Sequence, residues 1–108
     1  IKIKINSTTK NRGIFEKTLT NLEEKNIKVV LVYVPTISYY NQAEPEKFQE
    51  EINYYKKLPQ QFKNVHYLGY LEGWESNHSY FFDPIHMNPK GQAAFTKALS
   101  KDLKKLLP

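Results

Sequence analysis

Apolar residues recur at different spacings along the chain, and each spacing predicts a type of element. In residues 11–25 and 45–57 they recur every three or four positions, which predicts two amphipathic helices. Residues 28–34, KVVLVYV, form a nearly continuous β-branched apolar run, which predicts a strand buried on both faces. A shorter strand is predicted at 65–68. A last helix is predicted at 88–107, with an asparagine in the N-cap position and a proline directly after it.

The predicted order is helix, strand, helix, strand, helix, which favours an α/β fold with a short parallel sheet. Residues 1–6, IKIKIN, alternate as an exposed strand would, or form a poorly defined start over 1–10. The expected inward-facing residues of the three helices are Ile14, Phe15, Leu19 and Leu22, then Phe48, Ile52 and Tyr55, then Phe95, Ala98, Leu99, Leu103, Leu106 and Leu107. Three such apolar stripes need a larger sheet surface to pack against than two strands supply. We therefore expect residues 1–108 to form one unit without an internal domain boundary, and this unit to be part of a larger domain.

Composition narrows the function classes. The net charge is +5, but Arg12 is the only arginine and the lysines are scattered, so we expect a solvated surface suited to an anionic polymer and no nucleic-acid partner. The absence of cysteine excludes disulfides, thiolate metal sites and a cysteine nucleophile. No apolar run reaches 18 residues, so no transmembrane segment is expected in this chain.

The segment FFDPIHMNPKG, residues 81–91, carries the candidate chemistry. On a turn that leads into a helix, the Asp83 carboxylate can reach Nδ1 of His86 and leave Nε2 to accept a proton from a serine. A turn that Asp83 begins and Asn88 caps is the structural alternative. A metal site using His78 with these two residues has the wrong spacing, so no metal is expected. Proton transfer between a serine and His86 needs no other cofactor, so none is expected.

Aromatic residues crowd the two loops that follow the predicted strands: Tyr39, Tyr40, Tyr67, Tyr70, Trp74, Tyr80, Phe81 and Phe82. They would stack on sugar rings or shape an acyl pocket if they bind a ligand. The alternative is that they cover the end of the sheet as ordinary packing. Trp74, between a glycine and a glutamate, is the best candidate for a ligand contact.

The block FFDPIHMNPKGQAAFTKAL resembles the last conserved segment of the SGNH (GDSL-like) hydrolase superfamily, in which Asp-x-x-His-x-Asn-x-x-Gly opens the C-terminal helix. The strand KVVLVYVPTISYY is similar to a segment of cell-envelope SGNH-like proteins related to teichoic-acid D-alanyl transfer and alginate acetylation. The resemblance implies a flavodoxin-like three-layer α/β/α sandwich and ester hydrolysis or O-acyl transfer. By motif matching, Asp83 would be the orienting acid and His86 the general base.

The Gly-Asp-Ser block and the oxyanion-hole segments of that superfamily have no counterpart here. We therefore expect the C-terminal half of such a domain, incomplete as a catalyst, whose partner is the missing N-terminal part or a second chain. Ser38 is a weak candidate nucleophile, because it lacks a nucleophile-elbow pattern. The expected substrate contacts are Ser38, Tyr39, Trp74 and Asn88.

Two further interpretations stay open. One is a non-catalytic SGNH-derived module that binds carbohydrate or a partner protein. The other is a self-contained chain that pairs its sheet edge as a homodimer. The resemblance also favours a location in the cell envelope and an envelope polysaccharide or acyl ester as the ligand.

Overall fold

The structure is a computed structural model that describes residues 9–37 and 43–107, with the side chains of residues 9 and 10 left aside. These residues form two compact units. The first, called the sheet unit, comprises the described residues 9–33 and 43–69; the second, called the turn unit, comprises 34–37 and 70–107. The predicted leading strand at 1–6 lies outside the described residues.

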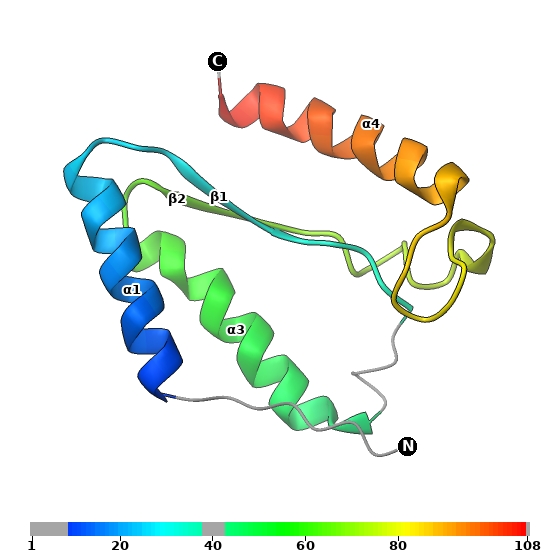
Figure 1. Cartoon of the computed structure of the whole chain (residues 1–108), viewed down its shortest axis with the longest axis horizontal. Coiled ribbons are helices and arrows are strands. Elements are labelled where there is room, and N and C mark those ends of the chain that lie inside the picture. Colours follow the sequence, from blue (N-terminus) through cyan, green and yellow to red (C-terminus); the bar gives the residue numbers. More distant parts are fainter. Residues whose placement is uncertain (1–8, 38–42, 108) are drawn as a thin grey trace. The chain divides into compact units, whose positions relative to one another are not determined.

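The sheet unit contains helix α1 (Thr9–Glu24), strand β1 (Val29–Tyr33), helix α3 (Pro45–Gln61) and strand β2 (Val65–Gly69) (Figure 1). The strands pair in parallel, with Val29 opposite Val65 at one end and Tyr33 opposite Gly69 at the other. The turn unit contains a short 3₁₀ helix, η1 (His78–Tyr80), and helix α4 (Pro89–Leu106). The predicted element order, the parallel pairing and the α/β class are confirmed.

The core of the sheet unit joins both helices to one face of the strand pair. Leu19 of α1, Leu58 of α3 and Val65 of β2 are 1%, 0% and 2% exposed. Alternate β1 residues, Val29 and Leu31, pack against this cluster. The prediction that β1 is buried on both faces is wrong, because all five of its residues are only half-buried. Both helices contribute side chains to this one cluster, so they cover one face of the strand pair. Because successive strand residues point to opposite faces, the helices bury only every second residue of β1.

Two predictions about the helices need correction. Helix α3 was expected to end before Pro59, yet it continues through this residue to Gln61. Fully buried Leu58 anchors that turn, and its carbonyl accepts a hydrogen bond from Phe62 N at 2.9 Å. Two expected inward residues, Ile14 and Leu107, are 59% and 47% exposed instead. The burial of a helix face depends on what lies against it, which periodicity alone does not give.

The single arginine connects α1 to α3. Arg12 forms an ion pair with Glu51 at 2.6 Å, and its guanidinium lies 4.2 Å from the centre of the Tyr54 ring. Tyr54 in turn donates a hydrogen bond to Glu16 at 3.0 Å. Burial and this hydrogen bond raise the pKa of Tyr54 to about 12. Arg12 therefore contributes to packing within the sheet unit.

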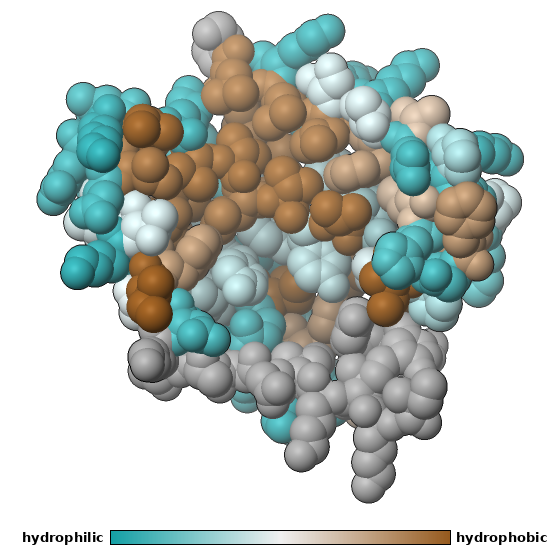
Figure 2. All heavy atoms as spheres, viewed as in Figure 1, coloured by the Kyte–Doolittle hydropathy of each residue, from teal (hydrophilic) through white to brown (hydrophobic). Residues whose placement is uncertain are grey.

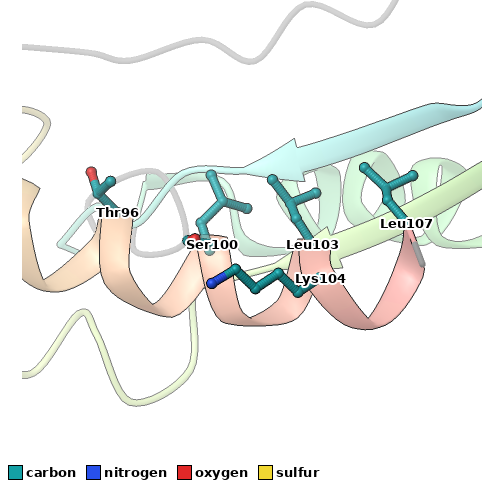
Figure 3. Close-up of a pocket in the computed structure, with 6 residues that line it drawn as sticks. Thr96, Ser100, Leu103, Lys104 and Leu107 are labelled. Atoms are coloured by element: carbon teal, nitrogen blue, oxygen red, sulfur yellow. The ribbon is translucent and has the colours of Figure 1, made fainter.

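None of the three α-helices in the described part of the chain combines the length and the hydrophobicity needed to cross a membrane. Helix α4 nevertheless carries a continuous apolar stripe. Figure 2 shows hydrophobic residues gathered near the C-terminal end of this helix. An open groove of about 380 Å³ runs there, lined by Thr96, Leu99, Ser100, Leu103, Lys104 and Leu107. Leu103 and Leu107 point to the same side of the helix (Figure 3).

Candidate active site

A closed turn presents the Asp83 and His86 side chains in the turn unit. Asp83 Oδ1 accepts hydrogen bonds from Ile85 N and His86 N, both at 2.8 Å. Phe82 N donates to His86 O at 2.9 Å, and Phe81 and Met87 form an antiparallel bridge. An aspartate favours such a turn because its short carboxylate reaches backbone amides two and three residues ahead. The predicted turn is therefore present and hydrogen-bonded at both ends.

The same carboxylate holds the imidazole of His86. His86 Nδ1 lies 2.9 Å from Asp83 Oδ2 and 3.0 Å from Asp83 Oδ1. The pKa of Asp83 is below its usual range, because hydrogen bonds to its carboxylate stabilise the charged form. The largest contribution comes from Ile85 N, and smaller ones come from the side chain and the backbone of His86. An ionised carboxylate has only acceptors, so Nδ1 must carry the hydrogen and Nε2 is left with its lone pair.

The two interpretations of this motif are thus compatible. Asp83 stabilises the turn through Oδ1 and orients the imidazole through both oxygens. The side chains of His86 and Asp83 are 72% and 50% exposed, so a solute can reach the imidazole. Structure alone therefore gives a preformed acid–imidazole pair, which is the geometry that a general base requires.

Asn88 fixes the start of α4 next to this turn. Its Oδ1 accepts a hydrogen bond from Gly91 N at 2.9 Å, as the N-cap prediction requires. Its Nδ2 donates to Ser79 O at 2.7 Å, which ties the helix to η1. The Asn88 side chain is thus engaged at both ends in holding the helix. Its role in binding a substrate stays a prediction.

A cleft of about 470 Å³ lies beside the imidazole within the turn unit. Its lining residues are Val34, Phe82, Ile85, His86, Met87, Gln92, Phe95 and Thr96. His86 is the one ionisable side chain among them. An apolar cleft with a single titratable group on its wall is typical of a small-molecule site. The aromatic and helical positions among these residues were predictable from the sequence. No sequence signal indicated that Ile85, Met87 and Gln92 share a cleft with His86.

Trp74 is not among the residues that line the cleft, but it packs against one of them, Phe95. Its ring meets those of Tyr70, Tyr80 and Phe95 with centroid distances of 6.5, 5.8 and 5.9 Å. Tyr70, which is 8% exposed, also donates a hydrogen bond to Asp102 of α4 at 2.6 Å. This cluster favours the packing interpretation for these aromatics, and Phe95 connects it to the cleft. A direct ligand contact by Trp74 stays a prediction.

Two further candidates, Ser38 and Tyr39, lie outside the described residues. The segment just before them belongs to the turn unit, where Ile37 N donates a hydrogen bond to Pro84 O at 3.0 Å.

Among residues 9–37 and 43–107, no three histidine or acidic side chains gather closely enough to hold a metal ion. His78 lies in η1.

Comparison of this chain with protein-family models, with curated proteins and with solved structures finds no match. The functional argument therefore rests on the motif, the turn and the cleft.

Proposed function

We propose that Asp83 and His86 are the orienting acid and the general base of an SGNH-type serine esterase or O-acyltransferase. The observation that carries the proposal is the contact of His86 Nδ1 with both carboxylate oxygens, at 2.9 and 3.0 Å, on the wall of an open cleft. The proposal includes a flavodoxin-like α/β/α sandwich, to which this chain contributes a C-terminal part. It also includes a substrate of the cell envelope, such as an acylated polysaccharide.

The chemistry follows the order of proton transfers at Nε2. His86 Nε2 removes the proton of a serine hydroxyl as the serine oxygen attacks the ester carbonyl. The imidazolium that forms is stabilised by Asp83, and it gives the proton to the departing alcohol, which leaves an acyl-serine. Water, or a second alcohol, then attacks the acyl-serine while Nε2 takes its proton, and the imidazolium returns this proton to the serine oxygen as the bond between that oxygen and the acyl carbon breaks. Water yields a carboxylic acid and free serine, and an alcohol yields a new ester and free serine.

The serine and the oxyanion donors come from a chain segment other than the described residues or from a second chain. Without them the largest contributions to the rate are missing. We accordingly expect the 108-residue chain by itself to hydrolyse esters no faster than exposed imidazoles do.

The decisive assay measures hydrolysis of p-nitrophenyl acetate and of p-nitrophenyl hexanoate by the natural polypeptide that contains this chain. Asp83→Asn should lower kcat by a factor on the order of 10⁴ with little change in KM, since the imidazole loses its orienting carboxylate. His86→Ala should lower it at least as far. His78→Ala is the matched control, because His78 is an exposed histidine of the same unit. Equal activity of the parent polypeptide and its three variants would refute the proposal.

A binding module without catalysis is the second candidate. Phe82, on the cleft wall, is 73% exposed, and such a ring suits stacking on a sugar or a partner side chain. Absence of esterase activity in the natural polypeptide, together with polysaccharide binding that Phe82→Ala abolishes, would favour this candidate.

A further inference from the structure

The chemistry of the cleft lining restricts what the cleft can bind. Five of its residues are apolar: Val34, Phe82, Ile85, Met87 and Phe95. None of the lining residues is acidic, and none is a lysine or arginine. A charged group that left water for this cleft would find no acidic, lysine or arginine side chain in the lining to pair with, which makes its binding unfavourable.

The polar atoms of the lining are few and partly used. Gln92 Nε2 donates a hydrogen bond to Met87 O at 3.0 Å, so one of its two amide hydrogens is already engaged. Thr96, one helical turn later, also lines the cleft and carries a hydroxyl. A sugar presents a hydroxyl on nearly every carbon, and this lining cannot satisfy them. The sugar portion of an acylated polysaccharide therefore suits the cleft poorly.

We infer that the cleft beside His86 binds the acyl portion of the substrate, and that this acyl group is uncharged, apolar and longer than acetyl. The inference rests on the proposed function for the orientation of the ester, and it deepens that function by naming the substrate class. The volume of about 470 Å³ supports the length, because a water molecule in the liquid takes up about 30 Å³. An acetyl group would leave most of such a cleft filled with water.

Binding of acyl amides, which resist hydrolysis, tests the inference on this chain directly. Acetamide, butanamide and hexanamide are titrated while the backbone amide signals of the cleft residues are followed by NMR. Each methylene that is half-buried should tighten binding about twofold, so Kd should fall about 15-fold from acetamide to hexanamide. 6-Aminohexanamide, which has the same chain with a terminal ammonium, should bind at least fivefold more weakly than hexanamide.

A pair of variants locates the site. Ile85→Ser should weaken hexanamide binding at least threefold, because Ile85 is 41% exposed on the cleft wall. Ile27→Ser is the matched control, since Ile27 is 45% exposed in the other unit and should leave Kd unchanged. Trp74 fluorescence checks that the Ile85→Ser protein is folded. If it is not folded, hexanamide binding is measured on Phe82→Ser instead, because Phe82 lines the same cleft.

Equal affinity for the three amides, or tighter binding of the ammonium compound, would overturn the inference. Shifts confined to the groove at Leu103 and Leu107 would also overturn it. These outcomes are separate from failure of the proposed function, which the Asp83→Asn and His86→Ala assays detect. A chain-length dependence without any esterase activity would establish the apolar ligand and reject the catalytic role.

Discussion

Replacement of Gly91 by alanine tests how the start of α4 is held against η1. Gly91 is a buried residue in the first turn of the helix. A Cβ at this position would collide with the backbone oxygen of Tyr80 and would lie 2.8 Å from its Cβ. That oxygen already accepts a hydrogen bond from Asn88 N at 2.9 Å. Relief of the collision requires the helix start and η1 to move apart, which also disturbs the candidate site.

The expected cost follows from three contributions. An alanine in a helix gains about 1 kcal/mol over glycine. Overpacking against backbone costs about 2–3 kcal/mol, because backbone cannot swing aside as a flexible side chain can. Loss of the Asn88–Tyr80 hydrogen bond adds about 1 kcal/mol. The net prediction is a decrease of about 2–3 kcal/mol in the free energy of unfolding of the turn unit.

Urea unfolding followed by Trp74 fluorescence measures this free energy, since the only tryptophan lies in the turn unit. Gly13→Ala is the matched control: Gly13 lies inside α1, and a Cβ there would have no atom within 4 Å. That variant should stabilise the sheet unit by about 0.5–1 kcal/mol, measured by circular dichroism. The two glycine-to-alanine changes are therefore predicted to shift the free energy of unfolding in opposite directions. A Gly91→Ala protein as stable as the parent would refute the packing described for α4.

Two further predictions concern pH. The pKa of Asp83 is lowered, so its stabilisation of the turn is complete above the ordinary carboxyl pKa of 3.8 and is lost as the pH falls through the lower folded value. Carboxyl carbon NMR should give a midpoint below 3.8, and a midpoint at or above it would contradict the hydrogen-bonded turn. Burial and the bond to Asp102 raise the pKa of Tyr70 to about 12, so its contribution is complete below pH 10 and is lost as the pH rises through about 12. Near-ultraviolet absorbance of the parent minus that of Tyr70→Phe should show this late ionisation, and a midpoint near 10 would exclude it.

Local patterns were sufficient for much of the fold. The periodicities predicted every α-helix and strand of the described residues to within four positions, and Asn88 is the N-cap of α4 as expected. The errors in predicted burial have one physical origin. Burial of Ile14, Leu107 and the second face of β1 depends on the surfaces that lie against them, and the sequence spacing does not contain that information.

The candidate site was predictable where it is local in sequence. The three-residue separation of Asp83 and His86 suffices to bring Nδ1 within 2.9 Å of the carboxylate. The cleft was not predictable, because its wall combines Val34 with residues more than forty positions later. Trp74 shows another limit: its polar sequence neighbours do not indicate that its ring packs on Tyr70 and Phe95.

The most direct test of the acid–imidazole pair is the tautomer of neutral His86, read from ¹⁵N–¹H correlations of its ring. The ionised carboxylate requires the hydrogen on Nδ1, so the parent protein should show Nδ1–H with Nε2 unprotonated. Asp83→Asn should shift the population toward Nε2–H, and His78 should not change. A parent protein in which His86 carries its hydrogen on Nε2 would contradict the account, because such a ring cannot accept a serine proton there.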